Sequence, residues 1–138
     1  MKDRAFLDTN VLVYLYSEDE PDKQAVAIEA MNSYMCATST QALNEFCNVC
    51  LKKLRMPAEV IGLSIDEISD SCSISFVDET IIHKTLVLHA KYGYTYYDCL
   101  ILASALASQC KYLLTEDMNN GQIIEKTLTI INPFALSK

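Results

Sequence analysis

The sequence has few of the residues that mark linkers and disordered segments. Only three glycines and three prolines occur among 138 residues, and no internal repeat or block of like charge interrupts the chain. Hydrophobic residues make up 51% of the sequence and charged residues 21%, a balance that is typical of globular proteins. A chain of this length fits one hydrophobic core. We therefore expect a single folded domain over residues 1–138.

A long hydrophobic run is also missing. No segment approaches the roughly 18 consecutive apolar residues that cross a bilayer, and the first eight residues hold too few apolar side chains for an export signal. These absences predict a cytoplasmic protein with no membrane partner. Of the six cysteines only Cys47 and Cys50 are closely spaced, which does not indicate a four-ligand zinc site. We expect all six to be reduced, small core residues.

Basic residues are scarce relative to acidic ones. Eleven lysines and arginines stand against eighteen aspartates and glutamates, which gives a net charge of −7. Proteins that bind nucleic acid without sequence preference are usually basic, because lysine and arginine neutralise the phosphates. The charge argues against that class of protein. It leaves an enzyme open, because several acids can form one site whose charge a bound Mg²⁺ ion would offset.

The hydrophobic pattern alternates between short apolar runs, which predict strands, and residues at three-to-four spacing, which predict helices. Ser39 or Thr40, together with Asp78, can cap helices, and Gly93 suits a helix end. This alternation favours a three-layer α/β/α sandwich with a central, mainly parallel sheet. The expected strands are 4–8, 35–38, 73–77, 112–114 and 128–131, and the expected helices are 22–34, 40–55, 57–69, 78–92 and 97–110, with a helix or turn at 11–16.

Four acidic residues are expected at one edge of this sheet. Asp8 ends the first predicted strand and Asp117 follows strand 112–114, while Glu45 and Asp98 lie near helix starts. In open parallel folds the carboxyl ends of the strands form one edge, where ligands bind. Crowded carboxylates repel and raise one another's pKa unless a cation lies between them. Oxygen ligands of this kind suit Mg²⁺ or Mn²⁺.

Each of these acids also has an ordinary structural interpretation. With eighteen acids in the chain, one near each strand end is not rare, and any one alone fits a helix cap or a solvated charge. For Asp98 the alternative is an N-cap, although its apolar neighbours would leave a buried charge without an evident partner. For Asp8, which also has apolar neighbours, a structural role stays open. The pattern alone therefore predicts an acidic metal site and no particular reaction.

Four stretches of the sequence resemble the PIN-domain family of metal-dependent ribonucleases and, within it, the VapC-like toxins of toxin–antitoxin pairs. The resemblance covers nearly the whole chain, and it is carried by the order and spacing of the stretches together. They are Phe6-Leu-Asp-Thr-Asn-Val-Leu-Val-Tyr14, Ser39-Thr-Gln-Ala-Leu-Asn-Glu-Phe46, Tyr97-Asp-Cys-Leu-Ile-Leu-Ala-Ser-Ala105, and Leu113-Leu-Thr-Glu-Asp-Met118 followed by Gly121.

The resemblance implies a Mg²⁺- or Mn²⁺-dependent endoribonuclease in which the acids act as metal ligands and proton acceptors. Asp8, Glu45 and Asp98 match the family's three principal acidic positions, with Asp117 as the fourth. Many relatives carry Thr-x-Asn-x-x-Asp in the last motif, whereas here the acid and the amide are exchanged. Asn120 is therefore the substitute candidate for the fourth position.

The resemblance also implies supporting groups and partners. Thr9, Asn10 and Thr115 match hydroxyl or amide positions that look like substrate-orienting groups. The implied partners are an RNA substrate, a small antitoxin protein and a second copy of the chain in a homodimer. Such an antitoxin would most simply place a basic side chain into the acidic rim.

A basic group follows Glu45 on the same predicted helix. Lys52, Lys53 and Arg55 can form a track for RNA phosphates, although a solvated helix end, where lysines are favoured anyway, fits equally well. A mechanism through His83 and His89 is disfavoured, because six residues apart on a helix they point away from each other.

Two alternative functions share parts of this pattern. One alternative is a PIN-fold protein that binds or processes RNA without being a toxin. A response-regulator-like signalling module also has acids at the carboxyl edge of its sheet, but that design needs a pair of acids at the first strand. Here the first strand offers Asp8 alone, so the signalling module fits poorly.

Overall fold

The computed structural model describes residues 1–136, and it folds them around one six-stranded sheet. The strands are β1 (Arg4–Leu7), β2 (Met35–Ser39), β3 (Cys72–Ser75), β4 (Tyr112–Leu114), β5 (Ile123–Ile124) and β6 (Leu128–Ile131). The helices are α1 (Thr9–Tyr14), α2 (Pro21–Ser33), α3 (Thr40–Lys52), α4 (Ala58–Ser71), α5 (Glu79–Tyr92) and α6 (Tyr96–Ala107), and the 3-10 helix η1 (Pro133–Leu136) follows β6.

The sheet is mainly parallel, as the sequence predicted. Its strand order is β3-β2-β1-β4-β6-β5, and every neighbouring pair is parallel except β5 with β6. Strand β1 lies between β2 and β4, and Ala5, Phe6 and Leu7 are fully buried. Strands that are buried on both faces have continuous apolar sequences. This is why β1 shows no alternation of polar and apolar residues.

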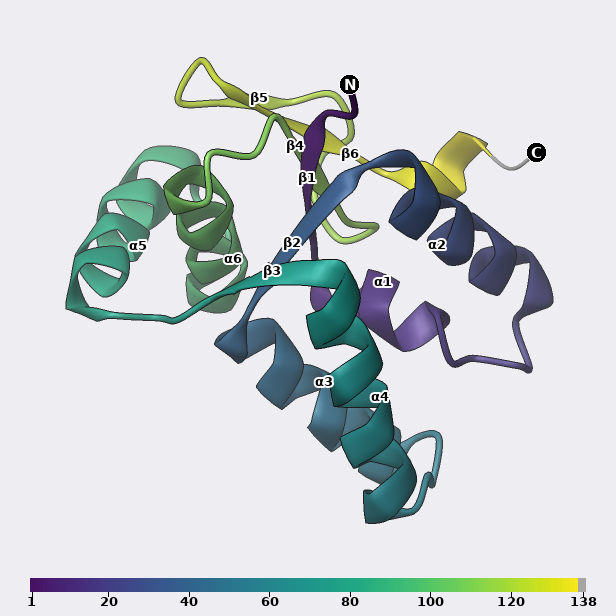
Figure 1. The fold of residues 1–138 in the computed structure, drawn as a ribbon. Coiled ribbons are helices and arrows are strands. Elements are labelled where there is room, and N and C mark those ends of the chain that lie inside the picture. Colours follow the sequence, from purple (N-terminus) through teal and green to yellow (C-terminus); the bar gives the residue numbers. More distant parts are fainter. Residues whose placement is uncertain (137–138) are drawn as a thin grey trace.

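Helices cover both faces of the sheet. Figure 1 shows α5 and α6 on one side of the sheet and α1 and α2 on the other. Helices α3 and α4 pack against each other and extend beyond the edge at which β1 and β2 end. The expected three-layer α/β/α architecture is confirmed. The first turns of α1, α3 and α6 are thereby directed to the carboxyl edge of the sheet.

Side-chain caps fix where the helices begin. Ser39 accepts a hydrogen bond from the backbone N–H of Ala42 at 3.2 Å and caps α3, and Asp78 caps α5. Thr95 caps α6 by accepting from the backbone N–H of Asp98 at 3.2 Å. The alternative interpretation of Asp98 as an N-cap is therefore wrong. Its carboxylate is left free for another role in the first turn.

The main differences from the expected elements are at chain reversals. Helix α6 ends at Ala107 rather than at residue 110, and Gln109 takes a left-handed φ of 56°. The hairpin of β5 and β6 was not predicted, because a two-residue strand leaves almost no hydrophobic pattern. Glu125 and Lys126 turn this hairpin with positive φ values, as the two central residues of a type I′ turn do, and the Thr127 N–H donates to the Ile124 carbonyl at 3.2 Å.

The cysteines pack into the core within residues 1–136. All six thiols are free, five are buried and Cys47 is half-buried, so they pack as small core residues. None of the helices in this part of the chain is long and apolar enough to cross a membrane.

Candidate active site

Asp8 lies at the centre of the acidic group and is almost completely buried. It follows the last residue of β1 and caps α1, and one carboxylate oxygen accepts from the Thr9 backbone N–H at 2.7 Å. The other oxygen accepts from the Thr115 hydroxyl at 2.8 Å. Burial, together with the charges of Asp117 and Asp98, raises the pKa of Asp8 to about 7 against the opposing effect of these two hydrogen bonds. An acid in this position favours a cation beside it.

Glu45 and Asp98 approach Asp8 from α3 and α6. Both are half-buried. The pKa of Glu45 is raised mainly by burial and also by the charge of Asp98, while a hydrogen bond from Gln41 lowers it. The pKa of Asp98 is raised mainly by burial and also by the charge of Asp117, while a hydrogen bond with the Thr95 side chain lowers it. Carboxylates from four segments of the chain therefore act on one another electrostatically.

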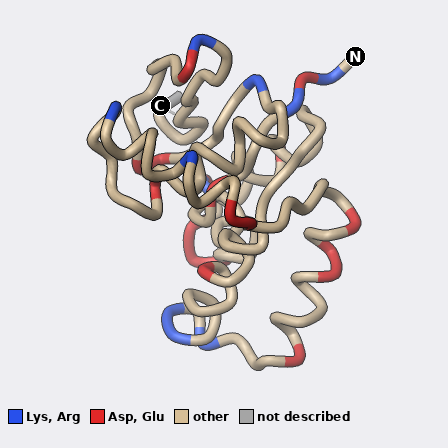
Figure 2. The backbone as a smooth tube through the Cα atoms, turned by 90° about the vertical axis from the view of Figure 1, so that its left-hand side faces the viewer, with Lys and Arg blue, Asp and Glu red and all other residues tan. Residues whose placement is uncertain are grey.

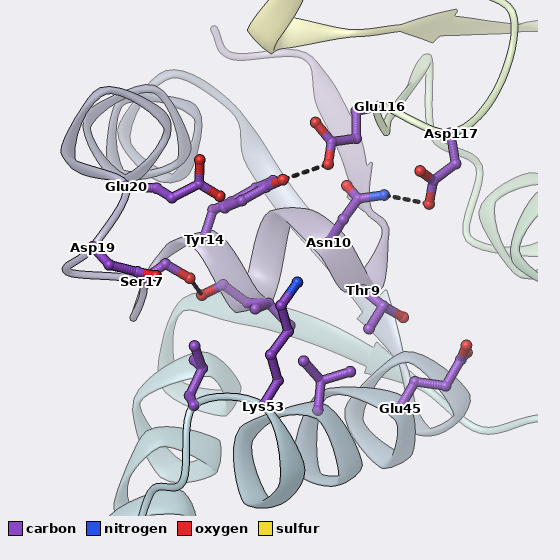
Figure 3. A pocket seen from close by; sticks show the side chains of 13 residues that line it. Thr9, Asn10, Tyr14, Ser17, Asp19, Glu20, Glu45, Lys53, Glu116 and Asp117 are labelled. Carbon is purple, nitrogen blue, oxygen red and sulfur yellow. Dashed lines mark hydrogen bonds between the residues drawn. The ribbon is translucent and has the colours of Figure 1, made fainter.

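Asp117 is held in place by Asn10. The Asn10 amide donates to the Asp117 carboxylate at 2.8 Å and to the Thr115 hydroxyl at 3.3 Å. The Thr115 hydroxyl also accepts from the Asp117 backbone N–H at 3.1 Å. Figure 3 shows Asn10 reaching from α1 to Asp117 on the loop that follows β4. Thr9, Asn10 and Thr115, which were singled out with the acids, are therefore found at the same place.

The acids are neighbours, but they do not form a finished coordination sphere. Among residues 1–136 no three histidine, cysteine or acidic side chains lie close enough together to hold a metal ion as they stand. Figure 3 shows Glu45 and Asp117 entering from opposite sides of Thr9. Like charges repel at short range, and Asp8, Glu45 and Asp117 each accept a hydrogen bond from a neighbouring side chain. The four predicted acids lie near one another, but their oxygens are not arranged as the ligands of a metal ion.

The chemistry of these residues nevertheless fits a hard divalent cation. Every candidate ligand is an oxygen atom, which is the donor that Mg²⁺ and Mn²⁺ prefer. The Thr9 hydroxyl and the Asn10 amide oxygen are buried without a hydrogen-bond partner in the described part of the chain. Buried polar atoms without partners are rare unless water or an ion satisfies them. The unpaired oxygens lie on the two residues that directly follow Asp8.

A pocket of about 290 Å³ opens beside the acids, between α1, α3 and the loop after β4. It is lined on one side by Glu45 and Asp117 and on the other by Asp19 and Glu20. Lys53 projects into it from the end of α3 (Figure 3). The residues that complete the lining are Thr9, Asn10, Val13, Tyr14, Ser17, Val49, Leu54 and Glu116.

Of the three predicted basic residues, the structure brings one to the pocket. Figure 2 shows basic residues grouped at the turn between α3 and α4. Of Lys52, Lys53 and Arg55 only Lys53 lines the pocket. Arg55 takes a left-handed φ of 53° in the turn itself. The pocket lining therefore includes one of the three cations, and a role of Lys52 and Arg55 in binding RNA stays a prediction.

Asn120 is occupied elsewhere. Its side-chain oxygen accepts from the backbone N–H of Asn132 at 2.9 Å, which ties the loop after β4 to the segment after β6. It does not line the pocket. Asp117, which contacts Asn10, is in the better position to serve as the fourth acid.

Glu116 lies at the site but was not predicted from the sequence. Glu116 accepts from the Tyr14 hydroxyl and from the Lys23 ammonium, which lies 3.2 Å from it. Lys23 also donates to the Tyr14 hydroxyl at 3.0 Å. The position of Glu116 directly before Asp117 was a visible clue, whereas nothing in the sequence pairs it with a lysine on α2. This network fixes the loop that follows β4, on the side away from Asp98.

The fold is similar to those of several solved toxin structures. One is a toxin–antitoxin complex from Klebsiella pneumoniae, with a TM-score of 0.70 and 21% identity, covering 94% of this chain and 97% of that chain. Another is VapBC2 from Rickettsia felis bound to a promoter DNA fragment, with a TM-score of 0.67 and 17% identity over 94% and 99% of the two chains.

A third similar structure is VapC20 from Mycobacterium tuberculosis, described as a toxin that cleaves the sarcin–ricin loop. Its TM-score is 0.62 and its identity 15%, covering 79% of this chain and 86% of that chain. No curated protein matches the chain by sequence. The model of the PIN domain family matches residues 5–122, a span that includes all four acids. This chain therefore belongs to the PIN domain family.

Proposed function

We propose that this protein is a Mg²⁺- or Mn²⁺-dependent ribonuclease that hydrolyses phosphodiester bonds in RNA. The observation that carries the proposal is the group of Asp8, Glu45, Asp98 and Asp117 at the carboxyl edge of the sheet, where burial and mutual charge raise the pKa of three of them. Membership of the PIN domain family supports it. At neutral pH the repulsion in a group of this kind is relieved by a proton on one of the acids or by a bound cation.

Asp8 and Asp98 would hold the metal, with Glu45 and Asp117 completing the set. A bound divalent ion lowers the pKa of a coordinated water and neutralises charge on the phosphate. Hydrogen bonds from Thr115 and from the Thr9 backbone orient the Asp8 carboxylate. The Asn10 amide keeps Asp117 turned toward the site. These contacts reduce the rearrangement that the acids must undergo, because their supporting groups are already in place.

Lys53 is the residue we propose for gripping the RNA backbone. It is exposed at the end of α3, it projects into the pocket, and no ion pair occupies it within the described residues. The acids of this pocket repel phosphate, so a substrate phosphate can be held there only near a cation. Lysine acts on phosphate as a point charge at the end of a flexible stem.

We further propose that the protein is the toxin of a toxin–antitoxin pair. By their descriptions, one of the similar structures is a toxin–antitoxin complex and another is a toxin. A small antitoxin would most simply fill the acidic pocket with a basic side chain. The proposal includes a homodimer, because α5 exposes Ile82, Leu86 and Val87, each more than two-fifths accessible, and apolar groups of this size are commonly covered by a partner.

Substitution of a central acid should abolish RNA cleavage. We expect Asp8→Asn and Asp98→Asn each to reduce the rate with Mn²⁺ by about 100-fold or more, because several kcal/mol of transition-state stabilisation depend on the metal. Asp66→Asn, an exposed acid on α4, is the matched control and should cleave at the parental rate. The products should carry 5′-phosphate and 3′-hydroxyl ends, and 2′,3′-cyclic phosphate ends would contradict hydrolysis by water.

Asp8→Asn should stabilise the metal-free protein at high pH. The pKa of Asp8 is raised from 3.8 to about 7 in the folded state, so its stabilising contribution is complete below the lower value and is lost as the pH rises through the upper one. Asparagine can still cap α1. With a chelator we expect the variant to melt at a higher temperature than the parent at about pH 8, and this gap should close toward about pH 4.

Excess Mn²⁺ should reverse the order of the two melting temperatures, so that the parent melts above Asp8→Asn. Binding to the folded parent raises its melting temperature, whereas Asp8→Asn lacks a central ligand and should respond little. A parent that is more stable than the variant at about pH 8 in chelator would show that Asp8 is not an uncompensated buried charge.

A charge reversal at Lys53 should weaken RNA binding more than the same change at Lys52. In the inactive Asp8→Asn background, Lys53→Glu is expected to reduce affinity and to lower the slope of log affinity against log salt by about 1, because one phosphate contact is lost. Lys52→Glu is the matched control, since it lies next in sequence but outside the pocket. Equal effects of the two variants in a titration with labelled RNA would indicate a solvated helix end.

Expression of the parent chain alone should stop the growth of a bacterial host. Asp98→Asn at the same protein level should permit growth, because the acid acts in the cleavage site. Colony counts after induction give the measurement. Normal growth with the parent, combined with RNA cleavage by the purified protein, would favour the non-toxin RNA-processing alternative.

A further inference from the structure

The loop of residues 115–122 carries Asp117 and must hold it against the repulsion of the other acids. This loop joins β4 to β5 and contains no regular helix or strand. On the α1 side, Asn10 and Thr115 bind Asp117 directly. From the α6 side the contacts come from Tyr94, which lies just before α6, while Ile130 and Asn132 bind the end of the loop from β6 and the segment after it.

The Tyr94 hydroxyl bridges two points of this loop. It accepts from the backbone N–H of Asn119 at 3.1 Å and donates to the side-chain oxygen of Gln122. Gln122 in turn donates its backbone N–H to Asn119 at 3.2 Å. The phenol therefore closes a small ring of hydrogen bonds just after Asp117.

The backbone of Tyr94 is fixed to the start of α6. Its carbonyl pairs with a ring nitrogen of His89 at 2.7 Å and accepts from the Cys99 thiol at 3.6 Å. The next residue, Thr95, caps the helix and binds the backbone N–H of Asp98. One side chain thus connects the segment that presents Asp98 with the segment that presents Asp117, and these two acids repel each other.

We propose that Tyr94 is a positioning residue that holds the Asp117 loop against the start of α6 and thereby sets the affinity of the acidic group for a divalent cation. The inference rests on the proposed metal site and adds to it a residue that carries no charge and is not itself a ligand. Groups that orient metal ligands typically change metal affinity by about 10- to 100-fold when they are removed.

Tyr92 offers an unusually close control. Its hydroxyl accepts from the backbone N–H of Glu125 at 2.9 Å and donates to the Glu125 carboxylate at 3.0 Å. It therefore makes the same two kinds of contact as Tyr94, but to the tip of the β5–β6 hairpin instead of the Asp117 loop. Replacing either tyrosine by phenylalanine removes one hydroxyl and keeps the ring.

The experiment measures Mn²⁺ binding to the full chain by calorimetry for the parent, Tyr94→Phe and Tyr92→Phe, alongside melting temperatures in chelator. We expect Tyr94→Phe to weaken Mn²⁺ binding by about 10-fold, with Tyr92→Phe close to the parent and the two metal-free variants similar in stability. Unchanged binding in Tyr94→Phe would overturn the proposal. Equal weakening in both variants would also overturn it, because the effect would then be a general loosening.

A second variant protects the test against misfolding of Tyr94→Phe. Gln122→Met replaces the side-chain amide, including the oxygen that accepts from the phenol, by a thioether of similar length, and it should weaken Mn²⁺ binding in the same direction but by less. Parental binding in Gln122→Met would overturn the proposal if Tyr94→Phe does not fold. A folded parent that binds no Mn²⁺ would overturn the proposed metal site itself. A parent that binds Mn²⁺, with variants that bind it equally well, would overturn only the role of Tyr94.

Discussion

Four carboxylates that gather at one edge of a sheet repel one another, and the surrounding structure is arranged around that repulsion. Asp8 is placed by β1 and cannot move far, because its two oxygens accept from Thr9 and Thr115. The other three acids reach the same place from α3, from α6 and from the loop after β4. Burial and mutual charge raise the pKa of Asp8, Glu45 and Asp98. The fold therefore stores a local instability that a divalent cation would relieve, a common feature of sites built for function.

Neutral side chains oppose this repulsion. Asn10, Thr115 and Tyr94 carry no charge, yet together they connect α1, the end of β4 and the start of α6. A further group, formed by Tyr14, Lys23 and Glu116, holds the same loop from α2. The hydrogen bond from Thr115 to Asp8 is buried, whereas those from Asn10 to Asp117 and from the Asn119 N–H to Tyr94 are exposed. Small polar contacts therefore keep the acids within reach of one another without neutralising them.

The charge of the pocket bears on both proposed partners. Acids line two of its sides and Lys53 enters from a third, so a phosphate and a basic side chain would prefer different parts of the same space. In the proposed function the phosphate would lie near Lys53 and a metal ion, whereas the basic group of an inhibitor would lie among the acids. The two partners would compete for one opening. This arrangement is consistent with a toxin whose inhibitor blocks its substrate site.

The sequence by itself predicted the long helices and the longer strands, and it named the four acids as candidates. Apolar runs such as Phe6-Leu7, caps such as Ser39 and Asp78, and the order of four motifs are local features, and local chemistry fixes them. The tertiary structure alone decided how the acids lie, that Lys53 faces the pocket while Lys52 does not, and that Tyr94 meets the Asp117 loop. These are contacts between segments far apart in the chain. They depend on packing angles and loop paths that no short stretch of sequence specifies, because each is the joint result of the whole core.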